Sequence, residues 1–190
     1  RVDKNLLLAR ALGAPVLKPR LFLRVGMEDE KITSAFLEDK GLDPERDLIV
    51  AMHPGAGVAA RQWGQGNFGE TARLLVRAGA RVLLFGGIRD RETALAIKRE
   101  APEVLNLAGK TGVRLMASLM ARCRVFVGNN SGPGHVAAAM GVPCVIAFSG
   151  CQDPREEAPY GVRCATLTHP VPCSPCRQTE CPLPGDEKMK

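Results

Sequence analysis

The chain has 190 residues, of which 45% are hydrophobic, and a formal net charge of +6 at pH 7. This length fits one ordinary α/β domain with an appendage, or two very small domains, and the hydrophobic content excludes intrinsic disorder except at the extreme C-terminus. No apolar segment approaches the roughly 18–20 residues of a membrane-spanning helix. The basic charge favours anionic ligands, but scattered arginines with only one Trp, one Tyr and six Phe argue against nucleic-acid binding.

The seven cysteines are an odd number, and Cys123, Cys144 and Cys164 lie in or beside apolar runs. Reduced thiols in the cytoplasm explain that pattern better than a secreted disulfide scaffold does, and no signal peptide is visible. We therefore expect a cytoplasmic protein. Because the sequence begins Arg-Val-Asp-Lys, without an initiator Met, we also expect a longer parent chain.

Residues 1–46 are expected to form a connecting segment with helices at 5–11 and 28–40. From residue 47 onward, short apolar strands alternate with helices of roughly 10 residues, which is typical of a parallel sheet covered on both faces. The predicted strands cover 48–52, 81–85, 104–107, 124–127 and 144–148, and the predicted helices cover 68–78, 89–100, 113–121 and 133–140. The sequence therefore predicts an α/β fold, a doubly wound Rossmann-like domain over 47–190, which ends in Pro-rich sequence and a Cys-rich loop.

The loops that follow the strands are the expected ligand sites, because helix N-termini present free N–H groups there. Loop 53–63 contains glycines that allow close approach of the backbone, and Arg61 offers a cationic fork for phosphate; a flexible loop with a solvated arginine is the alternative. Loop 86–92 begins with a glycine pair. There, Asp90 as a helix cap and Glu92 in the first helical turn explain the sequence without a ligand, and the chain has no GxGxxG motif.

The loop after the fourth predicted strand is the most unusual, because it reads Asn130-Ser131-Gly132-Pro133-Gly134-His135. Backbone N–H groups at Ser131, Gly132 and Gly134 would be exposed at a helix start, so a diphosphate could lie there with Ser131 and His135 as further donors. Glycine and proline at a helix start also occur for capping alone. A charged His gains nothing from the helix dipole at that end, so the placement of His135 favours an anionic partner.

Other chemistry has less support. There is no GxSxG elbow, the three histidines show no metal spacing, and no paired carboxylates lie at a predicted strand end. Cys173, Cys176 and Cys181 form a CxxCx4C pattern that suits a metal knuckle, with Cys151, Cys164 or His169 as the candidate fourth ligand. We favour unliganded thiols in a loop, so no metal site is predicted.

These loops, in this order, resemble the C-terminal half of glycosyltransferase family 9, the ADP-heptose:lipopolysaccharide heptosyltransferases. No single motif carries the resemblance, but five in register do. They are His53-Pro54-Gly55-Ala56 with Arg61 and Trp63, Leu84-Phe85-Gly86-Gly87, Leu107-Ala108-Gly109-Lys110-Thr111, Asn130 to His135 running into Ala137-Ala138-Ala139-Met140-Gly141-Val142-Pro143, and Cys173-Ser174-Pro175-Cys176 with Cys181-Pro182.

The resemblance implies one half of a GT-B architecture, in which two Rossmann-like domains face a cleft and the C-terminal domain holds the nucleotide-sugar donor, here ADP-heptose. GT-B enzymes generally need no metal, because helix N-termini and basic side chains stabilise the leaving diphosphate, so no cofactor is expected. The residues that match the family's diphosphate ligands are Arg61, Asn130, Ser131, Gly132 and His135, and those that match its nucleoside ligands are Glu92 and Thr111.

Two departures from the family pattern affect the expected site. The family usually has Asp where this chain has Asn130, which removes a charge, and often Lys where it has Arg61, which adds bidentate geometry. The family's acceptor site and catalytic Asp lie in an N-terminal half that this chain lacks. We therefore expect no catalytic residue in this chain, and expect it to bind the donor without transferring sugar efficiently.

Two functions follow as hypotheses. The first is the donor-binding domain of an inverting bacterial glycosyltransferase that transfers heptose, or a related sugar, to a lipid-linked or lipopolysaccharide-core acceptor. Its parent would work at the cytoplasmic face of the inner membrane, with peripheral membrane contact. The second is a non-catalytic interaction module stapled by a metal ion in the Cys loop. The sugar, the base, the acceptor and the oligomeric state are not specified by the sequence.

Overall fold

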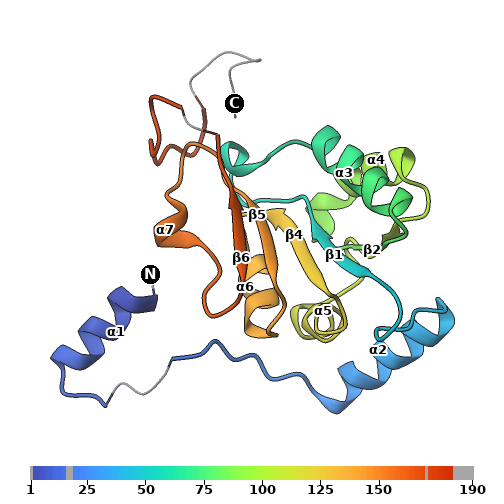
Figure 1. Ribbon diagram of the computed structural model, residues 1–190, viewed down its shortest axis with the longest axis horizontal. Coiled ribbons are helices and arrows are strands. Elements are labelled where there is room, and N and C mark those ends of the chain that lie inside the picture. Colours follow the sequence, from blue (N-terminus) through green and yellow to red (C-terminus); the bar gives the residue numbers. More distant parts are fainter. Residues whose placement is uncertain (1, 16–18, 170, 182–190) are drawn as a thin grey trace.

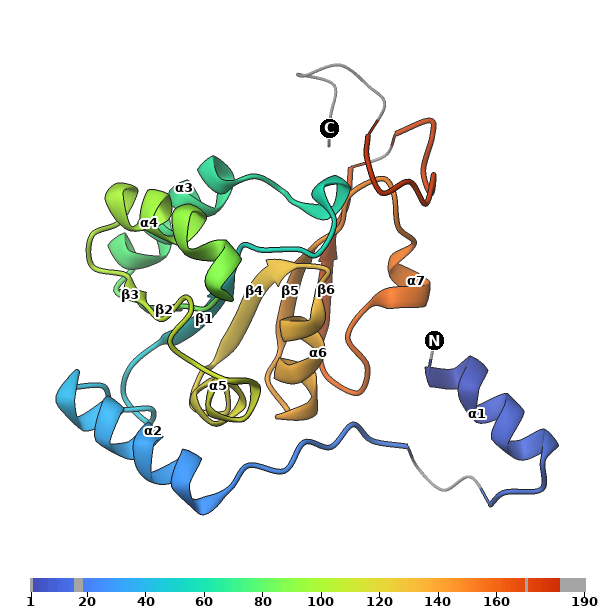
Figure 2. The same cartoon turned by 180° about the vertical axis from the view of Figure 1, so that it is seen from behind.

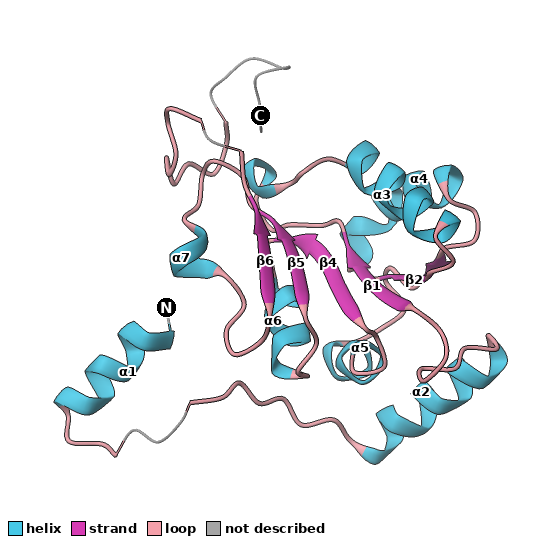
Figure 3. Cartoon of the chain, viewed as in Figure 1, coloured by secondary structure: helices cyan, strands magenta, loops and turns pink. Residues whose placement is uncertain are grey.

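Six parallel strands form the centre of the molecule (Figures 1 and 3). This computed structural model describes residues 2–15, 19–169 and 171–181. The strands lie in the order β3-β2-β1-β4-β5-β6. In chain order they are β1 (Ile49–His53), β2 (Arg81–Leu84), β3 (Leu105–Asn106), β4 (Val125–Asn129), β5 (Cys144–Ala147) and β6 (Cys164–Leu167).

The direction in which the sheet grows reverses between β1 and β4. The chain runs outward from β1 to β3 and then returns to place β4 on the other side of β1, where His53 pairs with Gly128. This is the strand order of the doubly wound Rossmann fold, whose ligands bind outside the carboxyl ends of the strands at the reversal point. The predicted fold class is confirmed.

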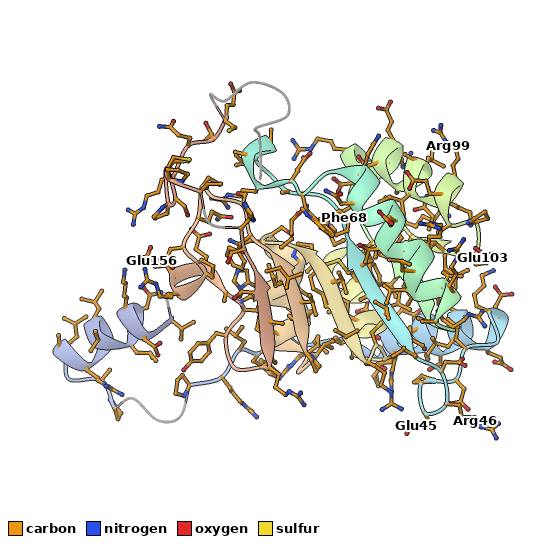
Figure 4. The ribbon with its side chains drawn as sticks, turned by 45° about the horizontal axis from the view of Figure 1, so that its top comes forward. Glu45, Arg46, Phe68, Arg99, Glu103 and Glu156 are labelled. Carbon is orange, nitrogen blue, oxygen red and sulfur yellow. The ribbon has the colours of Figure 1, made fainter. Side chains whose placement is uncertain are left out.

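Helices cover both faces of the sheet, and residues of β1 alternate between the two cores. Val50 and Met52 pack with Phe68 of α3, which Figure 4 labels, whereas Ile49 and Ala51 belong to the opposite cluster. Helices α5 and α6 lie in front of the strands in Figure 2. One face carries α3 (Gln65–Arg77) and α4 (Arg91–Glu100), and the other carries α2 (Met27–Asp39), α5 (Val113–Met120) and α6 (Gly132–Ala139).

Helix α2 is attached to this sheet although it lies in the predicted connecting segment. Its Leu37 belongs to the core cluster, and its buried Thr33 hydroxyl donates a hydrogen bond of 2.7 Å to the Ser118 hydroxyl of α5. The division of the chain at residue 47 remains a prediction.

Helix α1 (Val2–Ala11) lies at the periphery in both views and buries none of its residues (Figures 1 and 2). Its ion pair with the body of the domain joins Lys4 to Glu156, which Figure 4 labels, at 2.8 Å. Leu7, Leu8 and Leu12, on the helix or directly after it, keep more than half of their surface exposed. Within the described residues, no helix is long and apolar enough to cross a membrane.

The predicted strands and helices are all present, with ends shifted by a few residues. Two elements were missed in sequence that was expected to be irregular: α7 (Pro154–Glu157) and β6. Strand β6 is mostly exposed and lacks an apolar run, so its pattern gives little signal. The helix predicted from residue 89 begins as a 3-10 helix at Ile88–Asp90, and a second 3-10 helix, Ala59–Arg61, lies in the loop after β1.

Candidate functional site

The loops after β1, β2 and β4 line a cavity of about 590 Å³ at the point where the sheet reverses. We call it the switch-point cavity. Gly55 brings the β1 loop so close to Asp90 that a Cβ at this position would overlap the carboxylate. Residues that line the cavity include His53, Gly55, Gly87, Asp90, Ser131 and Gly132.

A polar network centred on His53 joins the three loops. The Ser131 hydroxyl lies 3.4 Å from Nδ1 of His53, and Nε2 of the same ring lies 3.8 Å from Oδ2 of Asp90. That carboxylate oxygen also accepts a hydrogen bond of 2.7 Å from the N–H group of Gly87. One buried imidazole therefore helps to fix the Ser131 hydroxyl relative to the loop after β2.

Burial lowers the pKa of His53 from its ordinary value of 6.5, and the nearby Asp90 carboxylate opposes that shift. The ring is therefore neutral at pH 7, with one nitrogen as donor and the other as acceptor. His53 adds no positive charge to the cavity. Its contribution is positional.

Asn129, at the end of β4, closes the loop after β1. Its fully buried side chain accepts a hydrogen bond of 2.9 Å from the N–H group of Trp63 and donates one of 2.6 Å to the carbonyl of Pro54. The Trp63 ring packs edge to face on Phe68 of α3, with ring centroids 5.3 Å apart. Sequence reasoning did not assign Asn129 a role; the available signal was an amide at the end of a buried strand.

Glu157, the last residue of α7, is the point where two predicted diphosphate ligands meet. Its Oε2 accepts a hydrogen bond of 2.9 Å from Nδ2 of Asn130 and lies 4.0 Å from Nη1 of Arg61. Nε2 of the buried Gln152 donates to the same oxygen. This carboxylate was missed because α7 was missed. The signal was the Asp153-Pro154 pair, in which the aspartate caps the helix by accepting from the N–H group of Arg155 at 2.9 Å.

The other predicted diphosphate ligands lie around the first turn of α6, which contributes to two cavities. Ser131 and Gly132 line the switch-point cavity. His135 lines a second cavity of about 470 Å³, with Val136 of α6 and with Glu156, Glu157 and Tyr160 from the α7 region; we call it the α6–α7 cavity. Residues of α1 and of the segment 21–23 form its remaining wall.

The predicted nucleoside ligands lie outside the lining of the switch-point cavity. Glu92 is exposed in the first turn of α4, and its neighbour Thr93 lines the cavity instead. Thr111 lines a third cavity, of about 600 Å³, between α2, α4 and α5. Its hydroxyl oxygen is buried and has no hydrogen-bond partner within the part of the chain that the structure describes.

The Cys loop packs against the loop after β5 as a backbone contact. The N–H group of Cys176 donates to the carbonyl of Gly150 at 3.3 Å, and that of Arg177 donates to the carbonyl of Cys151 at 3.0 Å. Across residues 2–15, 19–169 and 171–181, no three His, Cys, Asp or Glu side chains lie close enough to hold a metal ion. The hypothesis of a metal-stapled module therefore has no supporting cluster among them.

The site as a whole is suited to an anion. The eight-residue helix α6 begins at Gly132 with its N-terminus toward the cavities, and the Arg61 side chain is 37% exposed with a carboxylate at the limit of ion-pair distance. A helix N-terminus and a movable guanidinium bind phosphate groups without a metal ion. The polar network around His53 positions these groups.

Comparison with known proteins places this chain in one family. The sequence model of glycosyltransferase family 9 (heptosyltransferase) matches residues 2–186. Lipooligosaccharide heptosyltransferase 2 of Haemophilus influenzae is 34% identical over 156 residues, which are 79% of this chain and 44% of that protein. The chain thus spans less than half the length of this relative.

Solved structures of similar fold include members of the same family. A family 9 glycosyltransferase from Veillonella parvula superposes with a TM-score of 0.77 and 25% identity, covering 87% of this chain and 47% of that one. The ADP-heptose lipopolysaccharide heptosyltransferase II of E. coli superposes with a TM-score of 0.66 and 27% identity, covering 86% of this chain and 52% of that one.

Proposed function

Because this chain belongs to glycosyltransferase family 9, we propose that it forms the donor-binding domain of an inverting glycosyltransferase. The enzyme transfers heptose, or a related sugar, from a nucleoside diphosphate sugar to a lipopolysaccharide-type acceptor and releases the nucleoside diphosphate. The names of the relatives support both substrates, and coverage of about half of each relative supports a single domain of a GT-B pair. The parent enzyme works at the cytoplasmic face of the inner membrane with peripheral contact, and uses no metal cofactor.

The observation that supports this proposal is that Ser131 and Gly132 line the switch-point cavity at the start of α6, at the reversal point of the sheet. Arg61 lies outside the lining of that cavity and is linked to this turn through Glu157, which is 4.0 Å from Arg61 and accepts a hydrogen bond from Asn130. A diphosphate there accepts hydrogen bonds from the backbone N–H groups of the first turn and from the Ser131 hydroxyl. When the donor binds, the Arg61 side chain turns from Glu157 to the phosphate. Its planar guanidinium can donate two parallel hydrogen bonds to the phosphate oxygens.

These groups assist the transfer by stabilising the leaving group. An acceptor hydroxyl attacks the anomeric carbon from the face opposite the diphosphate, the bond from carbon to the diphosphate oxygen breaks, and the sugar is inverted. The negative charge that develops on the diphosphate is met by donors already in place, which lowers the barrier. The hydroxyl proton goes to a base outside this chain.

Calorimetry with ADP and with adenosine tests the diphosphate site. Arg61→Ala, Ser131→Ala and His135→Ala are each expected to weaken ADP binding about tenfold, because a hydrogen bond to a charged group contributes about 1.5–3 kcal/mol. Adenosine lacks the diphosphate, so its affinity should change by less than about twofold.

Arg77→Ala is the matched control, because this arginine is exposed in the last turn of α3 and lies outside the lining of the switch-point cavity. It should leave both ligands unaffected. Equal losses for ADP and adenosine in the site variants would refute the diphosphate assignment. Absence of ADP binding at millimolar concentration, with the chain folded, would refute the donor-binding function itself.

A further inference from the structure

We infer that Glu157 recognises the sugar of the donor, an assignment that rests on the proposed function. Its carboxylate accepts hydrogen bonds from sugar hydroxyl groups in the α6–α7 cavity. A neutral polyhydroxylated sugar fits this subsite, and a sugar that bears its own carboxylate does not.

One oxygen of this carboxylate is fully engaged by the protein and the other is not. Asn130, Gln152 and Arg61 all approach Oε2. Within the part of the chain that the structure describes, Oε1 has no hydrogen-bond or ion-pair partner, and the side chain remains 30% exposed. The protein thus fixes the group through one oxygen and leaves an acceptor at the other, which is the arrangement that a hydroxyl ligand requires.

The position of Glu157 relative to α6 places it on the sugar side of the donor. Nucleotides of doubly wound folds lie at the switch point, so the nucleoside end of the donor belongs in the switch-point cavity. The diphosphate then lies at the first turn of α6. Because this turn borders both cavities, the group beyond the diphosphate enters the α6–α7 cavity, where Glu157 lies with Tyr160 and His135.

Asn130 gives the second, independent indication. Its amide donates to Glu157 at 2.9 Å, whereas an aspartate at this position would place two carboxylates within hydrogen-bond distance and repel it. Residue 130, where the family pattern has a carboxylate, therefore carries the amide, and the adjoining residue 157 carries the charge. The amide orientation of Gln152 follows from the same contact, since its Nε2 donates to Glu157 and its buried Oε1 has no partner among the described residues.

The carboxylate also determines which sugars fit. An ionised carboxyl group accepts hydrogen bonds and cannot donate them, so it selects hydroxyl groups. A second anionic group at the same place is disfavoured by charge repulsion.

Calorimetry with ADP and with ADP-heptose on the full 190-residue chain tests the assignment through Glu157→Gln. The glutamine keeps its oxygen toward Asn130 and Gln152, which donate to it, and so presents an NH₂ group to the sugar. ADP-heptose affinity should fall about tenfold, because a charge-assisted hydrogen bond is lost. ADP affinity should not fall, because the variant removes a negative charge beside Arg61.

Glu70→Gln is the matched control, since it removes the same charge from an exposed side chain of α3 that is paired with Arg73 at 3.4 Å and lines neither cavity. It should leave both affinities within about twofold. If thermal unfolding shows that Glu157→Gln is not folded, the double variant Asn130→Asp/Glu157→Gln replaces it. The double variant keeps one amide in contact with one carboxylate, with the two groups exchanged between positions 130 and 157. The double variant should bind ADP-heptose within about threefold of the wild type, because the carboxylate stays at the subsite.

Parallel losses for ADP and ADP-heptose in Glu157→Gln, or no loss for either, would overturn the sugar assignment while leaving nucleotide binding intact. In the double variant, a sugar-specific loss as large as that expected of Glu157→Gln would overturn the exchange of roles. If the folded wild-type chain binds neither ligand, the proposed function fails and the sugar assignment fails with it.

Discussion

His53 shows how one buried residue can position the other groups of a site without contacting the reacting atoms. The ring is buried at the end of β1, in reach of the Ser131 hydroxyl and of the Asp90 carboxylate, each from a different loop. A protonated ring would carry charge into a site with little solvent, so burial keeps it neutral. Its protonation state is therefore linked to the stability of the fold.

The free energy of unfolding should decrease in mild acid because of His53. In the folded chain its pKa lies below 6.5, so below that pH the unfolded chain binds the proton more readily. The contribution of neutral His53 to the free energy of unfolding is complete above about pH 6.5 and is lost as the pH falls below that value. Urea denaturation at pH 7.5 and at pH 5.5 measures this effect. Between these two pH values, the free energy of unfolding should decrease more for the wild type than for His53→Gln.

His169→Gln is the control for this measurement, because His169 is exposed. It should follow the wild type at both pH values. Identical pH dependence in the wild type and in His53→Gln would contradict the linkage.

Residues differ in how far sequence alone could place them. Ser131 and Gly132 were predictable, because they follow a recognisable strand and precede a recognisable helix. Glu157 was not, since its role depends on how a short, unpredicted helix folds back toward Arg61 and Asn130. Such contacts join residues far apart in the chain and leave no periodic pattern.

At the scale of elements, the contact between β1 and β4 determines the geometry of the site. Gly128 of β4 lies beside His53, and an added Cβ would come within 2.8 Å of the His53 carbonyl oxygen and of the Phe126 ring. These two strands border the reversal point of the sheet. Their close approach keeps the loops that follow them in register.

Gly128→Ala should lower the free energy of unfolding by about 1–3 kcal/mol, because overpacking in a close-packed core displaces its neighbours. Gly66→Ala is the comparison, since no atom lies within 4 Å of its added Cβ and the position is helical. It should be neutral or stabilising by up to about 1 kcal/mol. Urea denaturation measures both, and equal effects would argue against the close packing of β1 and β4.

The elements that sequence predicted are those with continuous burial or a helical period. β1 is buried along its whole length, and α5 repeats apolar residues at helical spacing, at Val113, Met116, Ala117 and Met120. β6 and α7 have neither property, because they lie at the border of the sheet where burial is partial. A strand at the edge of a sheet forms because a neighbouring strand has a free side with which it can pair. The residue pattern of the edge strand itself does not contain that information.

At the scale of the whole molecule, the chain consists of a packed domain and a loosely attached helix. α1 buries none of its residues, and its ion pair to α7 is between exposed side chains. Exposed ion pairs contribute little to stability, about 0–1 kcal/mol. The exposed leucines 7, 8 and 12 form the apolar surface of this segment.

Deletion of residues 1–12 should therefore change the free energy of unfolding by less than about 1 kcal/mol. It should also reduce self-association at high protein concentration, measured by sedimentation velocity, because exposed apolar side chains are removed. A loss of several kcal/mol on deletion would show that α1 is part of the packed core.

The two hydrogen bonds of the Asn129 side chain hold the ends of the loop after β1 together. Because one side chain holds both Pro54 and Trp63, the two ends of this segment are fixed by β4. Lengthening such a loop costs little, about 0.6 kcal/mol for each doubling, when its ends are already held together. Changes around Arg61 that keep Gly55 and the buried Ala60 could therefore alter recognition without redesign of the sheet.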